Sequence, residues 1–169
     1  MKSLPSSIVI LGFLIGSLPI LELNTAAFLN AEDSTELLLE KEEDKKKRNT
    51  ELKQLEAAAE KAEDSMLWTR ALELRKQIFS LAKRTYGYTH AESSTALKNL
   101  GSLYSDLGQY EKAKPLLKQA LEISKKVNGL EHPITGTVLN NLGLLYSDLG
   151  QYEKAEPLYK QSLAISKKV

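Results

Sequence analysis

The strongest constraint on this chain is a segment that occurs twice. The sequence LYSDLGQYEKA stands at 103–113 and again at 145–155, a spacing of 42 residues. Extending the comparison to 90–127 against 132–169 gives 27 identities in 38 positions, more than shared helical composition produces. A fixed period of this length indicates one supersecondary unit that buries its apolar face against copies of itself. We therefore expect a stack of repeats whose function lies on the surface of the array.

Each copy has the pattern of two helices joined by a tight turn. Apolar residues recur every three or four positions, as on one face of an α-helix, at Leu97, Leu100, Leu103, Tyr104 and Leu107. Gly108 follows, and a residue without Cβ can adopt the left-handed conformation that ends a helix. A second helical pattern then runs from Tyr110 to Lys126. Gly101 and Gly143 interrupt the first helices, which predicts that the partner helix approaches closely at these positions.

The residues of these hairpins carry a family resemblance. The pattern L-x-N-L-G-x-L-Y-x-x-L-G-Q-Y-E-K-A, followed by P-L-x-K-Q and a Lys-Lys end, resembles the tetratricopeptide repeat, in the 42-residue variety of kinesin light chains and many bacterial arrays. The matching positions are Leu97, Leu100, Gly101, Tyr104, Gly108, Tyr110, Ala113, Pro115 and Ala120, and in the next copy Leu139, Leu142, Gly143, Tyr146, Gly150, Tyr152, Ala155 and Pro157. The resemblance implies an all-α fold, a right-handed superhelical solenoid of helical hairpins.

A diverged copy precedes these two. Shifted by 42 residues, it aligns Trp68 with Tyr110, Ala71 with Ala113, and Gly87 with Gly129. Met66 replaces the turn glycine. Because the first unit of a stack has no predecessor to cover, we expect its outer side to be more polar. The predicted array therefore spans 48–169, with repeats at 48–89, 90–131 and 132–169.

Residues 1–31 have the order of a secretory signal peptide. Lys2 supplies a positive start, 8–21 is a nearly unbroken apolar run of 14 residues, and small residues follow. A membrane span needs about 20 apolar residues, so the run is short for a span and export to a periplasm, a lumen or the exterior is expected. Cleavage after Ala27 or after Ala31 would fit, although neither site is a clean A-x-A motif.

Two further predictions concern the segment before the repeats. An uncleaved membrane anchor over residues 8–23 is the alternative to export, and membrane contact is expected only in that case. Residues 32–47 are predicted to be a charged spacer or helix, because the run EKEEDKKKR at 40–48 cannot bury apolar surface and is most simply a solvated helix or spacer.

Composition and motifs exclude several functions. A net charge of +1 gives no electrostatic reason to bind nucleic acid, and the absence of cysteine removes disulfides, thiol catalysis and thiolate metal sites. The sequence shows no nucleophile beside a base, no glycine-rich phosphate loop and no metal-ligand spacing. His90 and His132 occupy equivalent turns and are expected to cap helices rather than to bind a metal. We therefore expect neither an enzyme nor a cofactor.

The resemblance implies a protein or peptide partner on the concave face, which the first helix of each repeat lines. The family pattern places there the candidate residues Thr95, Lys98, Asn99, Ser102, Asp106, Thr137, Asn140, Asn141, Leu144 and Asp148. Asn99 and Asn141 are the strongest candidates, because an amide can donate to and accept from a peptide backbone. A solvated face, with both asparagines bonding the local turn, is the alternative. The mixed lining does not fit a basic clamp for an acidic tail.

The end of the array suggests a second function. The printed sequence stops with the second helix of the third repeat, which predicts an uncovered apolar stripe at Leu158, Tyr159, Leu163 and Ile165. Such a patch favours association, most simply as a two-fold homodimer. The sequence thus indicates a protein-interaction scaffold, with a self-assembling structural protein as the alternative.

Overall fold

The computed structural model describes the backbone of residues 20–168 and the side chains of residues 37–168. The chain forms two compact units, 1–44 and 45–169. The predicted signal segment and both predicted cleavage sites lie outside the described side chains. Helix α1 (Ile20–Asp64) includes the predicted charged spacer 32–47, which is therefore helical. None of the helices within the described range is long and apolar enough to span a bilayer.

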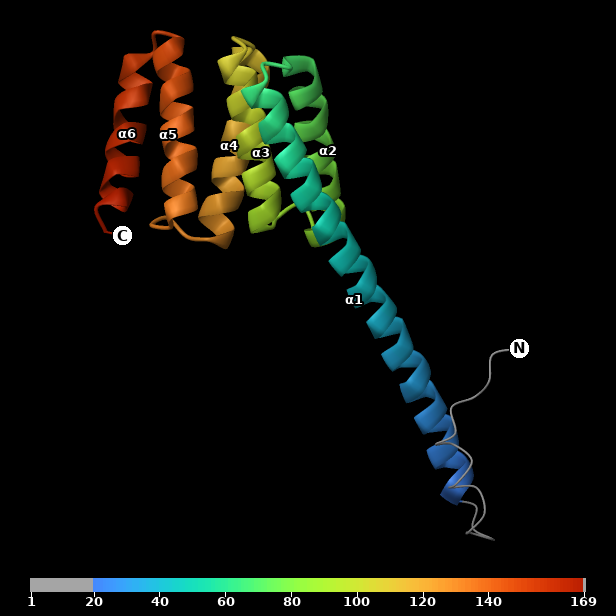
Figure 1. The fold of residues 1–169 in the computed structure, drawn as a ribbon. Helices are drawn as coiled ribbons and strands as arrows, with labels where there is room; N and C mark the ends of the chain where they lie inside the picture. Colours follow the sequence, from blue (N-terminus) through green and yellow to red (C-terminus); the bar gives the residue numbers. More distant parts are fainter. Residues whose placement is uncertain (1–19, 169) are drawn as a thin grey trace. The chain divides into compact units, whose positions relative to one another are not determined.

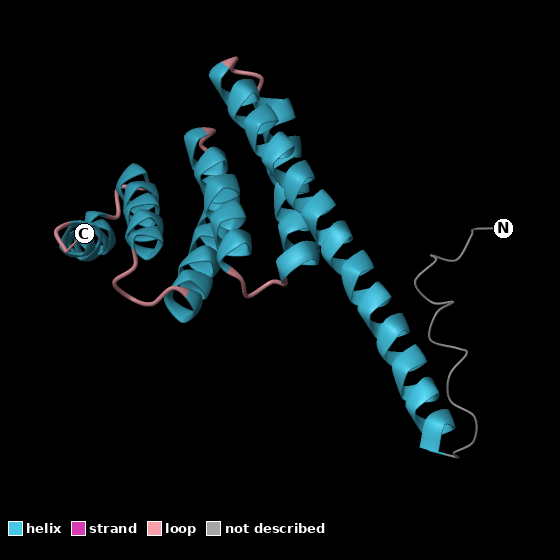
Figure 2. Cartoon of the chain, turned by 60° about the horizontal axis from the view of Figure 1, so that its bottom comes forward, coloured by secondary structure: helices cyan, strands magenta, loops and turns pink. Residues whose placement is uncertain are grey.

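The unit from residue 45 onward is a row of helical hairpins (Figures 1 and 2). After α1 come α2 (Trp68–Tyr86), α3 (Ala91–Asp106), α4 (Tyr110–Val127), α5 (Pro133–Asp148) and α6 (Tyr152–Ser166), and residues 20–168 contain no strand. The second half of α1 pairs with α2, α3 with α4, and α5 with α6. Successive hairpins meet where α2 packs on α3 and α4 packs on α5. The expected all-α stack of three hairpins is confirmed.

The three hairpins share one turn geometry. Gly108 and Gly150 adopt φ values of 68° and 69°, and Met66 adopts 56° at the equivalent position. The amide that follows each of these residues donates to a carbonyl of the preceding helix, as in the bond of 2.8 Å from Leu67 N to Ala62 O. This bond closes the helix end as glycine-based C-caps do. Met66 therefore keeps the turn in spite of its Cβ atom.

Within the second and third hairpins the two helices touch at a glycine. A Cβ atom added to Gly101 would lie 2.9 Å from Cγ of Leu117, and one added to Gly143 would lie 2.9 Å from Cε1 of Tyr159. Both distances are shorter than carbon–carbon contacts allow. The predicted close approach of the partner helix is therefore confirmed at both positions.

Buried hydroxyl groups mark the junctions between hairpins. At the junction of α4 and α5, the Thr135 hydroxyl lies 2.7 Å from Ser124 Oγ and donates to the Gly129 carbonyl at 2.8 Å. At the junction of α2 and α3, Ser93 makes the equivalent bond to the Gly87 carbonyl at 2.7 Å. Because buried hydroxyls that lose their partners are costly, these bonds help to fix how one repeat sits on the next.

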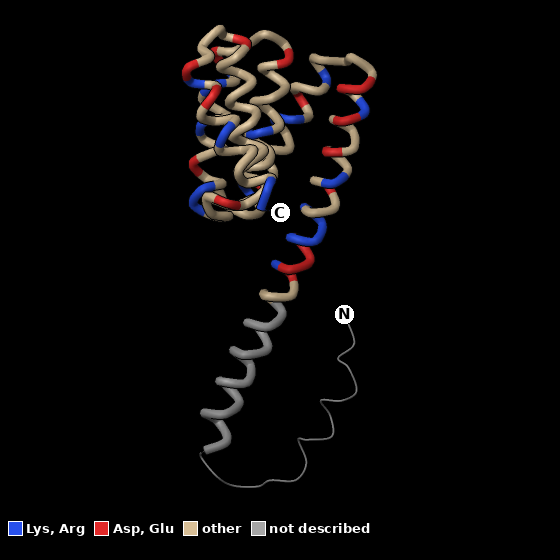
Figure 3. The backbone as a smooth tube through the Cα atoms, turned by 90° about the vertical axis from the view of Figure 1, so that its left-hand side faces the viewer, with Lys and Arg blue, Asp and Glu red and all other residues tan. Residues whose placement is uncertain are grey.

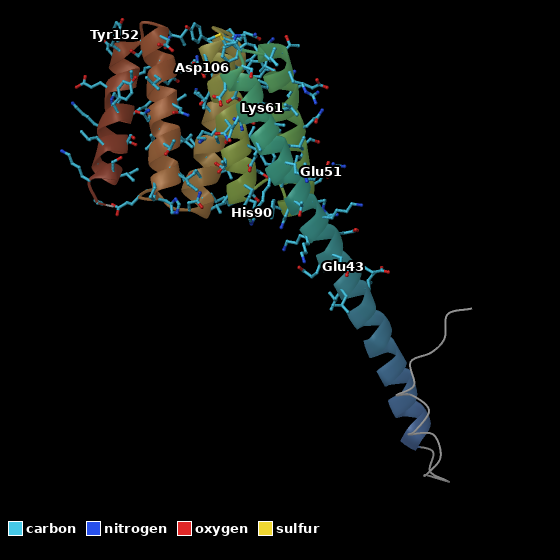
Figure 4. All side chains as sticks on the ribbon, viewed as in Figure 1. Glu43, Glu51, Lys61, His90, Asp106 and Tyr152 are labelled. Carbon is cyan, nitrogen blue, oxygen red and sulfur yellow. The ribbon has the colours of Figure 1, made fainter. Side chains whose placement is uncertain are left out.

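The outer side of α1 is polar within the array unit. In α3 and α5, the stripe that faces the preceding helix is buried and consists of Ser93, Ala96, Leu103, Thr135, Val138 and Leu145. The equivalent positions of α1 are Glu51, Gln54 and Lys61, and all three are exposed. Figure 4 labels Glu51 and Lys61 on this helix. The expected polar outer side of the first repeat is therefore confirmed.

Candidate functional site

The first helices of the hairpins present a common open side, here named the first-helix face. On α3 and α5 it consists of Thr95, Asn99, Ser102, Asp106, Thr137, Asn141, Leu144 and Asp148, all half-buried or exposed. Residues at spacings of three and four lie on the same side of a helix. Because α3 and α5 also contact each other directly, the two rows form one surface.

The two asparagines of this face differ in their partners. Asn141 Nδ2 donates to Ser102 Oγ at 2.6 Å, a bond that links α5 to α3. The position of Ser102 is occupied by Glu60 on α1, and the side-chain amide of Asn99 makes no hydrogen bond to another described residue. Asn141 therefore bonds the neighbouring repeat rather than the local turn, and the Asn99 amide remains available.

Asn99 lies beside a hollow of about 300 Å³ that opens between the first and second repeats. The hollow is lined by Glu63, Asp64, Trp68, Arg75, Asn99, Ser102, Leu103 and Asp106. On one wall the Arg75 guanidinium donates to both carboxylate oxygens of Glu63, at 2.7 and 3.0 Å. Such a two-point pair holds the wall in a fixed geometry.

Acidic groups dominate this end of the first-helix face. Burial raises the pKa of the Asp106 carboxyl from its ordinary value of 3.8, and the nearby charges of Glu63 and Asp148 raise this pKa further. Asp106 lies at the end of α3 (Figure 4), where it faces the negative end of the helix dipole. Over the rest of the array unit, charges of both signs are interspersed (Figure 3).

The remaining predicted site residues lie apart from this hollow. Thr137 and Asn140 line a second hollow of about 490 Å³ between α5 and α6, and Thr95 lines a smaller one of about 140 Å³ beside α1. Lys98 is half-buried, and its pKa is lowered by burial and by the positive charge of Arg75. Leu144 is exposed and apolar on α5.

Sequence analysis missed the wall that the first repeat supplies. Glu63, Trp68 and Arg75 belong to the diverged copy, and of these only Trp68 was matched to the repeated pattern, as the equivalent of Tyr110. Projecting the 42-residue period onto the end of α1 would have placed Glu63 and Asp64 beside this hollow, since they are equivalent to Ser105 and Asp106.

The two histidines differ. His132 Nδ1 accepts from the Ile134 amide at 3.2 Å and so caps α5 as expected. His90 makes no cap bond. Its ring stacks on Tyr86 with centroids 5.0 Å apart, and its Nδ1 contacts Glu92. Among the described side chains, no group of three or more His, Asp or Glu could hold a metal ion.

The predicted self-association stripe is only partly exposed. Leu163 is 55% exposed, whereas Leu158 and Tyr159 are half-buried. Ile165 is only 6% exposed because it packs on Gly136 of α5, so it does not belong to an exposed stripe. Tyr152, which sequence analysis did not include, is 68% exposed on the same side of α6 as Leu163.

A family comparison decides the identity of the fold. The family model described as tetratricopeptide repeat matches residues 57–126 and 106–168, which together cover more than half of the chain. The chain belongs to the tetratricopeptide repeat family. The first match begins inside α1 and contains α2, so the diverged copy is part of the array. No curated protein matches the chain.

Solved structures place this tetratricopeptide protein in the kinesin-light-chain-like variety. A putative kinesin light chain of Podosopora anserina with nearly identical TPR-like repeats is 26% identical, with a TM-score of 0.64 over 70% of this chain and 56% of its own. A variant form of that protein gives 26% and 0.63 over the same shares. BtubC (BKLC) of P. vanneervenii shares the fold at 21% identity, with a TM-score of 0.61 over 66% of this chain and 44% of its own.

The chain spans about half the length of these solved proteins. Tetratricopeptide arrays are in general scaffolds for protein–protein interaction and generally lack catalytic activity. The coarse function of this chain is therefore that of an interaction scaffold.

Proposed function

We propose that the tetratricopeptide array binds an extended segment of a partner protein along the first-helix face. The observation that carries this proposal is the side-chain amide of Asn99, which borders the hollow between the first two repeats and makes no hydrogen bond to another described residue. An asparagine amide can donate to and accept from the backbone of an extended peptide at the same time. Leu144, exposed on α5, offers a neighbouring apolar contact.

The charges on the first-helix face determine which peptide segments it is expected to bind. Asp106 lies with Glu63 and Asp64 around the hollow, and its pKa is raised first by burial and then by the negative charges of Glu63 and Asp148. Bringing an acidic segment to this face would therefore oppose like charges, which is unfavourable in a partly desolvated interface. The partner segment is expected to be neutral or basic where it crosses α3.

A peptide array probed with the full chain tests this proposal. The parent should bind a subset of peptides poor in Asp and Glu, and the double variant Asn99→Ala/Asn141→Ala should bind them at least about tenfold more weakly. Gln161→Ala, an exposed amide on α6, is the matched control and should leave binding unchanged. Equal binding by the parent and the double variant would contradict the proposal.

The variant Ser102→Ala tests whether the two asparagines contact the peptide or only hold α3 against α5. This variant removes the partner of Asn141 but leaves both amides in place. If the amides bind the peptide directly, Ser102→Ala should retain most of the affinity that the double asparagine variant loses. A loss as large as that of the double variant would instead indicate that the asparagines act only by holding α3 and α5 together.

We also infer that this chain itself is not an enzyme, in keeping with its family. The inference is supported by the repeated placement of its acids, since Asp64, Asp106 and Asp148 occupy equivalent positions in three repeats. Repetition of this kind follows from the scaffold, whereas a catalytic site needs different groups brought together.

We propose export from the cytoplasm. The support is the positive charge of Lys2, the apolar run at 8–21 and the small residues after it. The mass of the mature protein tests this proposal, because cleavage after Ala27 or Ala31 would remove a defined segment. A full-length product retained in the membrane fraction would indicate the anchor instead, and a full-length cytosolic product would contradict both.

A further inference from the structure

The hollow between the first two repeats, here named the junction hollow, carries negative charge without a cationic partner. Asp64 and Asp106 occupy equivalent positions of α1 and α3, and both line it. Within the described part of the chain, neither of them forms an ion pair with a lysine or arginine. Burial and the charges of Glu63 and Asp148 all raise the pKa of the Asp106 carboxyl, so no described cation offsets its charge.

The backbone adds to this negative potential. Asp64 is the last residue of α1, and Asp106 is the last residue of α3. The last carbonyls of a helix form the negative end of its dipole, and a cation nearby is stabilising. Both helices therefore present their negative ends beside the junction hollow, and a positively charged group is the occupant that this potential favours.

One wall of the junction hollow is aromatic. Trp68 lines the hollow and is 40% exposed, so part of its ring is open to an incoming group. The face of a tryptophan ring attracts cations, and the flat guanidinium of arginine stacks on it. The carboxylates among the described side chains form no group that could hold a metal ion. A basic side chain therefore fits this wall better than a metal ion does.

A buried arginine supplies a free donor to the junction hollow. Arg75 is 6% exposed, and its equivalent on α4 is the fully buried Leu117. Arg75 Nε and Nη2 donate to Glu63, whereas Nη1 donates to no described residue and is not enclosed by protein. A buried ion pair is seldom more stabilising than apolar side chains of similar volume. A ligand contact at Nη1 would explain the arginine, and a backbone carbonyl is the acceptor that an extended peptide offers.

We propose, on the basis of the peptide-binding function proposed above, that the partner segment inserts an arginine side chain into the junction hollow. The guanidinium lies against Trp68 and donates to Asp64 and Asp106, while a backbone carbonyl of the segment accepts from Arg75 Nη1. The volume of about 300 Å³ is at the lower end for binding pockets, so it suits one side chain rather than a whole segment. Arginine is preferred over lysine because its planar group can stack on the ring and donate to two carboxylates at once.

Tryptophan fluorescence of the full chain measures this contact, because Trp68 is the only tryptophan in the sequence. The probes are three sets of short acetylated peptides with neutral residues around a central arginine, lysine or citrulline. Citrulline keeps the shape of arginine but carries no charge. The arginine set should change the Trp68 emission saturably and bind at least about fivefold more tightly than the citrulline set, with the lysine set between them.

Matched variants assign the binding to the junction hollow. Asp64→Asn and Asp106→Asn keep the size of each side chain, and each should reduce the preference for arginine over citrulline. Glu111→Gln removes the same charge at an exposed carboxylate on α4 outside the hollow and should leave the preference unchanged.

A double variant tests the role of Arg75. Glu63→Ser/Arg75→Leu gives the first hairpin the residues that the second hairpin has at these positions. It should keep the helix content in circular dichroism and weaken the arginine and citrulline sets alike, because Nη1 contacts the peptide backbone. Unchanged affinity for both sets would show that Arg75 does not contact the peptide.

The outcomes distinguish this proposal from the proposed function. Equal binding of the arginine and citrulline sets that is lost in Asn99→Ala/Asn141→Ala would overturn the arginine contact but support peptide binding on the first-helix face. An arginine preference that neither Asp64→Asn nor Asp106→Asn reduces would overturn the assignment to the junction hollow. Absence of binding by every set would contradict both proposals.

Discussion

Met66 adopts in the turn of the first hairpin the left-handed conformation that Gly108 and Gly150 adopt in the other two hairpins. Substituting Met66 therefore tests directly what this conformation costs. A left-handed conformation costs a residue with Cβ roughly 1–2 kcal/mol, and the Met66 side chain is 72% exposed, so it contributes little packing. Met66→Gly should therefore raise the free energy of unfolding by roughly 0.5–1 kcal/mol, part of the gain being offset by the flexibility of glycine in the unfolded chain. Urea denaturation measures the change.

Gly108→Met is the reciprocal change. It places the same side chain in the equivalent turn of the second repeat, at a φ of 68°, and should lower the free energy of unfolding by about 1 kcal/mol. If Met66→Gly were destabilising, the Met66 side chain would have to contribute contacts that its exposure does not indicate.

Asn99 and Asn141 occupy the same position in adjacent repeats but should respond differently to truncation. Asn141→Ala removes the bond to Ser102 and leaves that hydroxyl without its partner, at a cost of about 1 kcal/mol. Asn99→Ala removes no bond to a described residue and should change the free energy of unfolding by less than about 0.5 kcal/mol. Thermal unfolding of the two variants measures the difference. Equal losses would contradict the assignment of partners.

The raised pKa of Asp106 predicts the direction in which the stability of the folded protein changes with pH. Because its folded-state pKa is raised above 3.8, the folded protein binds this proton more tightly than the unfolded chain does. Stability contributed by this group therefore falls as pH rises through the window between the ordinary and the raised pKa. Asp106→Asn should raise Tm at pH 7, by less than about 1 kcal/mol in free energy because solvent screens this largely exposed carboxyl.

The difference in Tm between Asp106→Asn and the parent should shrink as pH falls below 3.8, where the parent carboxyl is neutral in both states. Thermal unfolding of both proteins from about pH 7 to about pH 3 measures it. A difference that stays constant over this range would show that the Asp106 charge does not oppose folding.

At the scale of the helix, Gly101 and Gly143 set how closely the helices pack in the second and third hairpins. Alanine favours helix over glycine by roughly 1 kcal/mol, but the new Cβ would meet Leu117 in one repeat and Tyr159 in the other, each at 2.9 Å. Leu117 is fully buried and has no room to move, whereas Tyr159 is half-exposed and can turn outward.

Gly101→Ala should therefore lower the free energy of unfolding by roughly 1–3 kcal/mol, whereas Gly143→Ala should cost clearly less. Urea denaturation of both variants gives the comparison. A larger loss at Gly143 than at Gly101 would mean that the third hairpin is the more rigid one, against the exposure of Tyr159.

The helices and the faces that they bury were largely predictable from the sequence. The 42-residue period allows each residue to be compared with the residues at equivalent positions in the other repeats. Gly101, Gly108 and the repeat boundaries follow from that comparison alone. The residues that each side chain contacts across helices were harder to predict. The burial of Ile165 depends on Gly136 across the hairpin, and the bond of Asn141 to Ser102 depends on which residue the neighbouring repeat presents. Neither follows from periodicity, which gives the face of a helix but not its neighbour.

At the scale of the array, the first and third repeats expose different helix faces. The first repeat presents the polar outer side of α1, and the third presents the exposed Tyr152 and Leu163 of α6. Between them the hydroxyl bonds at Ser93 and Thr135 repeat the same junction. The junctions leave the first-helix face open for a partner segment.

The central claim is that a partner segment lies on the first-helix face, and amide chemical shifts of the isotope-labelled chain test it most directly. A peptide selected from the array should be titrated into the protein while the amide spectrum is followed. The largest shifts are expected at Asn99, Ser102 and Asp106 on α3 and at their equivalents on α5, with small shifts on α4. Shifts concentrated on α4 and α6, with α3 and α5 unchanged, would contradict the account.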